Sequence, residues 1–170
     1  MEQLVTFNCD KKKDELVKDL FVFSCFTGLS YSDMKGLKNS NIQDFFDGNR
    51  WIIVRRKKTA TSSNVMLLDI PKMIIEKYAG LSKDGKVFPT PSNTICNDSL
   101  KRISQLIDCL VEKKVTFHLA RHTFATRALN KGMRIEHVSK ILDHSDIGIT
   151  QIYAKIISEE LDNAVDKYVN

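Results

Sequence analysis

The sequence lacks an apolar stretch long enough to cross a membrane. Its longest apolar-rich run is LFVFSCFTGL at 20–29, whereas a membrane-spanning helix needs about 20 residues. The N-terminal segment MEQLVTFNCDKKKDEL also lacks the continuous apolar core of a secretory signal peptide. These absences argue against a membrane partner, and we expect a cytoplasmic protein.

Cysteines are few, and their spacing does not suit metal binding or redox catalysis. The four cysteines, at positions 9, 25, 96 and 109, form no C-x-x-C pair, and none lies near a histidine at zinc-finger spacing. This pattern favours reduced, mostly buried thiols in an intracellular protein. Internal repeats and low-complexity segments are absent as well.

The composition that is present fits one soluble globular domain. The chain has 170 residues, of which 42% are hydrophobic and 28% are charged, enough to build a sizeable core. We therefore treat residues 1–170 as a single domain. The net charge of +5 permits a polyanionic partner but does not demand one.

Helical periodicity dominates the chain. After a short extended lead-in at 1–9, Asp10 is a plausible N-cap for a helix that Gly28 would end. Pro71 and Gly80 bracket a further helix in the same way. We predict the remaining helices at 30–37, 98–113, 117–130, 134–142, 147–155 and 158–168.

A β-rich segment interrupts the helices. Asp47-Gly48 is a turn signal, and the runs on either side of TATSS are rich in β-forming residues. We predict one strand near 51–58 and another near 64–68. The fold is therefore expected to be mainly α with a small antiparallel β-sheet (α+β), inserted after the first two helices.

The stretch HLARHTFATRAL at 118–129 concentrates polar chemistry in a single helix. His118 and Arg121 are three residues apart and share a face, and His118 and His122 have a spacing that can suit a metal. A zinc protease motif would need glutamate at 119, where this chain has leucine. On these residues alone, an ordinary polar helical turn is the better explanation, and a metal-binding module is the least favoured.

Further motifs change that interpretation. LDHSDIGITQIYAK follows at 142–155, FTGLSYSDMKGL precedes at 26–37, and RRKKT lies at 55–59. In this order and spacing, the four motifs resemble those of the tyrosine recombinase (phage integrase) family. The resemblance covers residues 16–165, and its phrasing is most similar to integrases of Bacteroidetes-type mobile genetic elements.

The resemblance implies a fold, an activity and partners. It implies the DNA breaking-rejoining fold of a C-terminal catalytic domain, with the N-terminal DNA-clamping domain absent from this chain. The implied activity is site-specific DNA recombination or integration through a 3′-phosphotyrosine intermediate, without metal, ATP or another cofactor. The implied partners are double-stranded DNA and other recombinase protomers, which form a tetramer on two sites.

The resemblance also assigns roles that suit the chemistry of each side chain. Tyr153 becomes the nucleophile, because a tyrosine hydroxyl can form a covalent phosphate ester. Arg121 becomes the phosphate clamp, since its planar fork matches two phosphate oxygens. His118 becomes the acid/base group or a phosphate ligand, and His144 takes the catalytic site that holds histidine or tryptophan in relatives. Lys58 becomes the candidate general acid, although strand geometry alone favours a solvated strand lysine.

One position departs from the family pattern. The first signature of the family ends in TGLR, whereas this chain has Ser30 in TGLS, so one phosphate-binding arginine is missing. Because alternate strand residues face the same side, Arg56 should point with Lys58 and could replace that cation. Asp33 matches an acidic residue that orients the missing arginine in relatives.

Two other functions remain open beside recombination. The loss at Ser30 would also fit a catalytically impaired recombinase remnant that only binds DNA. A type IB topoisomerase shares the chemistry, but the integrase-like motifs favour recombination. In each case we expect phosphate contacts from basic side chains, and the candidates are Arg55, Lys57, Lys35 and Arg127.

Overall fold

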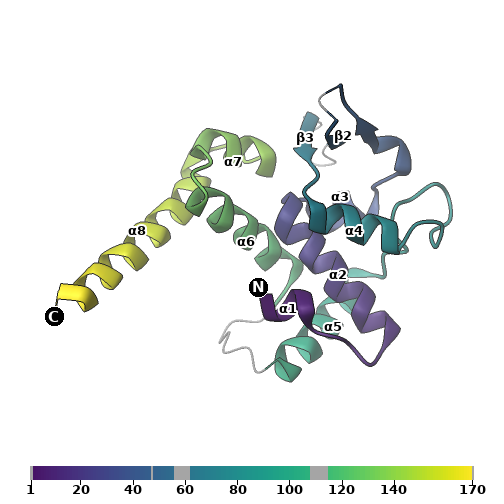
Figure 1. Ribbon diagram of the computed structural model, residues 1–170, viewed down its shortest axis with the longest axis horizontal. Coiled ribbons are helices and arrows are strands. Elements are labelled where there is room, and N and C mark those ends of the chain that lie inside the picture. The colour runs from purple at the N-terminus through teal and green to yellow at the C-terminus, as the bar shows by residue number, and fades with distance from the viewer. Residues whose placement is uncertain (1, 47, 56–61, 108–114, 170) are drawn as a thin grey trace.

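The computed structural model describes residues 2–46, 48–55, 62–107 and 115–169 (Figure 1). Helices make up most of it, with one small sheet on one side of the body. The elements are α1 (Glu2–Thr6), α2 (Lys12–Thr27), α3 (Tyr31–Lys35), the 3-10 helix η1 (Asn39–Asn41), β1 (Ile42–Asp44), β2 (Arg50–Arg55), β3 (Ser62–Met66), α4 (Asp69–Lys77), α5 (Asn93–Leu106), α6 (Phe117–Asn130), α7 (Ile135–Leu142) and α8 (Ile147–Val169).

Helix α2 is the central element, and it packs against α4, α5 and α6. Apolar side chains on nearly all of its faces are buried, among them Val17, Leu20 and Phe23, each 0% exposed, as expected for a helix surrounded by others. The helix ends at Gly28, whose φ of 67° is the left-handed conformation that glycine adopts without strain. Lys11, and not the predicted Asp10, occupies the N-cap position of α2.

The predicted antiparallel sheet is confirmed, and it has three strands in the order β1-β2-β3. Trp51 pairs with Met66 and Ile52 with Val65, so one face of the hairpin turns Ile52 and Val65 into the core. Strand β1 was not predicted from the sequence; it is only three residues long and pairs with β2. The last predicted residues of the first strand, 56–58, lie outside the described residues.

The structure corrects the sequence-based predictions in three helical regions. Residues predicted as an extended lead-in form α1, because Leu4 and Val5 pack against the core. Helix α5 starts at Asn93 rather than at 98, since Ser92 caps it by accepting a hydrogen bond from the Ile95 N–H. The two helices predicted at 147–155 and 158–168 are one continuous helix, α8, with no glycine or proline at 156–157 to interrupt it.

The buried side chains form two clusters. The larger one surrounds α2 and includes the inner face of the sheet. The smaller one joins α6, α7 and α8 and consists of Phe124, Ala125, Ala128, Val138, Leu142 and Tyr153. Helix α6 contributes to both clusters, so the junction between them lies along this helix.

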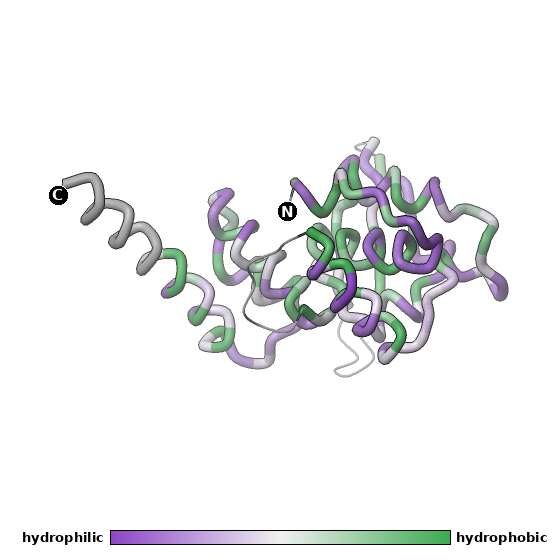
Figure 2. The backbone as a smooth tube through the Cα atoms, turned by 90° about the horizontal axis from the view of Figure 1, so that it is seen from below, coloured by the Kyte–Doolittle hydropathy of each residue, from purple (hydrophilic) through white to green (hydrophobic). Residues whose placement is uncertain are grey.

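Helix α8 leaves the body of the domain beyond its contacts with α6 and α7 (Figure 1), and Figure 2 shows hydrophobic residues along its first part. Its first half still carries exposed apolar side chains: Ile149, Ile152 and Ile156 are 42%, 60% and 41% exposed. None of the described helices is long and apolar enough to span a bilayer.

Candidate active site

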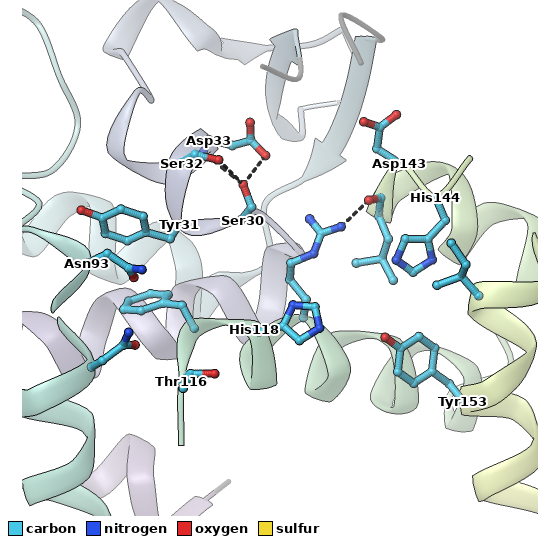
Figure 3. Close-up of a pocket in the computed structure, with 15 residues that line it drawn as sticks. Ser30, Tyr31, Ser32, Asp33, Asn93, Thr116, His118, Asp143, His144 and Tyr153 are labelled. Atoms are coloured by element: carbon cyan, nitrogen blue, oxygen red, sulfur yellow. Dashed lines mark hydrogen bonds between the residues drawn. The ribbon is translucent and has the colours of Figure 1, made fainter. Parts of the chain in front are cut away.

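A hollow of about 750 Å³ opens between the two clusters (Figure 3). Residues from widely separated parts of the sequence line it, including Ser30, His118, Arg121, His144 and Tyr153. The turn before α3 forms one wall, α6 forms the floor, and α8 with the turn before it forms the opposite wall. The hollow therefore brings together residues from three of the four motifs.

Arg121 is held in place by backbone carbonyl groups. Its Nη1 donates to the Gly28 oxygen at 2.9 Å, and its Nη2 donates to the Leu142 oxygen. These acceptors are the carbonyl that follows the end of α2 and the last carbonyl of α7. The guanidinium thus orders the junction, and its charge stands at the wall of the hollow, where it can attract a phosphate.

The two histidines of α6 and Tyr153 form a row of rings. His118 and His122 meet edge to face, with centroids 4.4 Å apart, and His122 lies 5.1 Å from the Tyr153 ring. His118 is exposed at the hollow, whereas His122 does not line it. His122 thus lies between His118 and the tyrosine.

Tyr153 is 6% exposed, and its ring belongs to the smaller buried cluster. Figure 3 shows its hydroxyl directed toward the space in front of His118. Burial raises the pKa of Tyr153 above its ordinary value of 10.0, and the nearby Arg121 charge opposes that rise. The hydroxyl is therefore protonated at neutral pH and needs a base to take its proton before it can react.

His144 lies in the turn between α7 and α8. Asp143, with a φ of 58°, ends α7 in the left-handed conformation and reverses the chain just before His144. The Nδ1 of His144 is 2.8 Å from the Thr150 hydroxyl, and its ring stacks on Tyr153 with centroids 6.4 Å apart. Burial, followed by the Arg121 charge, lowers the pKa of His144, so its neutral form predominates at neutral pH.

Ser30 has a structural role that its position in the motif did not reveal. It caps α3, because its hydroxyl oxygen accepts a hydrogen bond from the Asp33 N–H at 3.2 Å. The same hydroxyl donates to the Asp33 carboxylate at 2.7 Å (Figure 3). Asp33 is 9% exposed and also lines the hollow, so it adds negative charge beside the phosphate position that the family motif predicts.

The other predicted residues lie away from the hollow or outside the described residues. Arg56, Lys57 and Lys58 fall in 56–61 and are not described. Arg55 ends β2 and is exposed. Lys35 is exposed with its Nζ 5.8 Å from the Tyr31 ring centroid, and the exposed Arg127 stacks over Phe26 at 4.8 Å.

Sequence analysis missed several polar residues at the far side of the hollow. Asn93, Asn97 and Thr116 line it together with Tyr31. The asparagines were not considered because the start of α5 was predicted five residues too late, which left Asn93 and Asn97 in a loop. The Ser92 cap was the available signal.

Metal binding has little geometric support here. Within the described ranges, no group of three or more His, Cys, Asp or Glu side chains gathers as a metal site would require. His118 and His122 approach each other as an isolated pair of rings. The hollow thus combines one buried hydroxyl, one fixed guanidinium and two imidazoles, a set that can bind and attack a phosphodiester.

Comparison with known proteins identifies the family. Residues 1–160 match the model of the phage integrase family, and the chain belongs to this family. The tyrosine recombinase XerA of Saccharolobus solfataricus is 30% identical over 162 residues, covering 95% of this chain and 52% of the relative. The XerA of Thermococcus onnurineus is 29% identical over 171 residues, covering 92% of this chain and 56% of the relative.

Solved structures show the same fold. The XerH site-specific recombinase, bound to a palindromic difH substrate after cleavage, superposes with a TM-score of 0.77 at 19% identity, covering 99% of this chain and 50% of that one. The chain spans about half the length of the curated relatives it matches. The comparisons favour neither a topoisomerase nor a DNA-binding remnant, and the resemblance to Bacteroidetes-type elements stays a prediction.

Proposed function

We propose that this chain is the catalytic domain of a site-specific tyrosine recombinase, which cuts and rejoins DNA through a 3′-phosphotyrosine. One observation carries the proposal: Tyr153, Arg121, His118 and His144 surround one hollow although they come from separate segments. The family and the names of the relatives support it. Because those relatives are about twice as long, the activity of the whole protein belongs to this proposal as well.

In the proposed reaction, the Tyr153 oxygen attacks a phosphorus of the DNA backbone. A new bond forms between the tyrosine oxygen and the phosphorus, and the bond from phosphorus to the 5′ oxygen breaks. The tyrosine gives up its proton, and the departing 5′ oxygen takes one up. Rejoining is the same exchange in reverse, with a 5′ hydroxyl as the attacking group.

Arg121 would stabilise the negative charge that builds up on the non-bridging oxygens. His118 faces the hollow and would accept the tyrosine proton or donate to the phosphate. His144 is neutral, and its Nδ1 lies beside the Thr150 hydroxyl. In the tautomer that carries the proton on Nε2, His144 would donate a hydrogen bond to the phosphate. His122 would keep the Tyr153 ring oriented, because it lies between the tyrosine and His118.

The second phosphate-binding cation of the family motif has still to be assigned, because Ser30 replaces the arginine. We propose that Arg56 takes over the charge that Ser30 cannot supply, and that Lys58 protonates the departing 5′ oxygen. The support is the sequence, since Arg56 and Lys58 stand an even number of positions after Ile52 and Val54, which share the buried face of β2. Asp33 lies at the hollow and could orient either cation.

The proposed reaction needs neither metal nor nucleotide. The phosphotyrosine ester retains the energy of the broken backbone bond, so rejoining requires no ATP. Side-chain cations supply the charge that a metal ion supplies in other phosphoryl-transfer enzymes. Adduct formation should therefore be unchanged in excess EDTA and without added nucleotide.

The partners are double-stranded DNA and other protomers, assembled as a tetramer on two sites. Arg55, Lys57, Lys35 and Arg127 would contact the DNA backbone by charge. The projecting α8, with Ile152 and Ile156 exposed, supports docking onto a neighbouring protomer. We assign this chain to the catalytic part of the longer relatives, as a single domain of 1–170.

The proposal is tested by covalent capture. The intact protein is incubated with a pool of nicked duplexes that contain a randomised stretch, and protein–DNA adducts are isolated on a denaturing gel and sequenced. We expect adducts at a restricted set of sequences, none with Tyr153→Phe, and very few with Arg121→Ala. Adducts that persist with Tyr153→Phe would refute the assignment of the nucleophile, and a complete lack of wild-type adducts would refute strand transfer.

A further inference from the structure

A second hollow, of about 340 Å³, lies beside the far end of α3. It is formed by Lys35 at the end of that helix and by the segment between α4 and α5, which contributes Lys83, Lys86, Ser82 and Thr90. We call it the lysine hollow. Among the described residues, Asp84 is the only acidic one in its lining, so three lysines face one aspartate and the net charge is positive.

The three ammonium groups have no protein counter-ion among the described residues. No carboxylate of the described chain lies within ion-pairing distance of Lys35, Lys83 or Lys86, although Lys18, Lys72 and Lys77 all form such pairs. Thr90 adds a buried hydroxyl oxygen that has no hydrogen-bond partner in the described part of the chain. Like charges gathered around a hollow repel one another, and a bound anion relieves that repulsion.

The segment that carries Lys83 and Lys86 is fixed to the core. The Val87 N–H donates to the Leu37 oxygen at 3.0 Å, and the Asn39 N–H donates to the Gly85 oxygen at 2.9 Å. Phe88, 1% exposed, anchors the segment in the core. Because the backbone is already ordered, binding an anion there would cost little conformational entropy.

Helix α3 connects the lysine hollow to the candidate active site. Its first residue, Tyr31, lines the active-site hollow, and its last residue, Lys35, lines the lysine hollow. Four residues of α-helix span about 6 Å. The two hollows therefore lie at opposite ends of one five-residue helix.

From this charge and the position at the far end of α3, we propose that the lysine hollow binds a backbone phosphate of the DNA substrate other than the one that Tyr153 attacks. This inference rests on the proposed function, because it takes DNA as the substrate. Lysine ammonium groups contact phosphates as point charges and do not distinguish bases. The site would therefore position the strand without contributing to sequence choice.

The test compares two triple variants that each remove three positive charges. One is Lys35→Gln/Lys83→Gln/Lys86→Gln, and the control changes Lys11, Lys12 and Lys13 to glutamine. The control lysines are exposed at the start of α2, whereas the end of α2 meets the active site. The sixteen residues of α2 separate the two ends by about 24 Å.

Affinity for a labelled duplex of about 30 base pairs is measured by fluorescence anisotropy at several NaCl concentrations. Each phosphate contact contributes about 0.9 to the slope of log affinity against log salt. We expect the lysine-hollow variant to lose about one unit of slope and at least tenfold in affinity near 100 mM NaCl. The control variant should keep the wild-type slope.

Equal losses in the two variants, or an unchanged slope in the lysine-hollow variant, would overturn the proposal. The charge-retaining variant Lys35→Arg/Lys83→Arg/Lys86→Arg should restore the slope, and its failure to do so would also count against a phosphate site. Covalent capture separates this inference from the function on which it rests. If the wild type forms adducts but the lysine-hollow variant keeps the wild-type salt slope, only the phosphate site is refuted. If that variant loses slope but the wild type forms no adduct, only strand transfer is refuted.

Discussion

The missing arginine at Ser30 gives the sharpest prediction about catalysis. If Arg56 supplies the second phosphate-binding cation, Arg56→Ala should slow adduct formation at Tyr153. Loss of one preorganised donor at a developing anion costs about 2.7–4 kcal/mol, or about 10²- to 10³-fold in rate. Because Ser30 lines the hollow together with Arg121, adding Ser30→Arg to Arg56→Ala should recover most of that loss.

The structure also predicts a stability cost for the rescue. Ser30 caps α3 and exchanges hydrogen bonds with Asp33, and loss of such a cap costs about 1 kcal/mol. In a domain of this size, that corresponds to a decrease in Tm of roughly 2–4 °C. Ser30→Ala is the matched control, because it removes the cap and adds no cation.

The assay is single-turnover adduct formation on a nicked duplex selected as above, together with thermal unfolding of each variant. The double variant should be faster than Arg56→Ala by about two orders of magnitude, while Ser30→Ala/Arg56→Ala should be as slow as Arg56→Ala. The reasoning fails if Arg56→Ala cleaves at the wild-type rate while Arg121→Ala abolishes cleavage. A slow Arg56→Ala without rescue by Ser30→Arg would place Arg56 elsewhere on the DNA.

Three further predictions concern ionisation and packing. The pKa of His144 in the folded protein is below 6.5, so just below pH 6.5 the unfolded chain binds more protons than the folded one. Tm should therefore fall as the pH is lowered from 6.5. His144→Gln should make Tm depend less on pH in this range. The ultraviolet difference titration between wild type and Tyr153→Phe should give a tyrosine pKa above 10.0, and Arg121→Met should raise it further because the opposing charge is lost. Gly28→Ala should lower the free energy of unfolding by about 1–3 kcal/mol or more, because a non-glycine residue in the left-handed conformation is strained. The loss should exceed that of Gly80→Ala, because a Cβ at Gly28 would lie 2.9 Å from a phenylalanine ring carbon, whereas a Cβ at Gly80 meets nothing within 4 Å. Chemical denaturation of both variants checks this difference.

Local patterns in the sequence were sufficient for much of the fold. The helix at 117–130 was predicted with the bounds that the structure has, and the antiparallel pairing of the two longer strands was predicted from their composition and the turn before them. Elements that depend on distant contacts were not predictable in this way. Strand β1 and helix α1 are short, and packing against the rest of the domain stabilises them.

By itself, the sequence determined the identity of the reactive groups and their order along the chain. Tyrosine, arginine and histidine in these motifs indicate phosphodiester chemistry because of what each side chain can bind, attack or protonate. The serine in TGLS was equally visible, and it raised the question of the second cation.

Tertiary structure decided how these groups are held. Arg121 donates to a carbonyl 93 residues away in the sequence, His122 lies between His118 and Tyr153, and Ser30 caps a helix at the rim of the hollow. Only packing brings such distant segments together, because contacts between helices depend on side chains that no local period specifies. The pKa directions of His144 and Tyr153 follow from that packing as well, since burial is the largest cause of both.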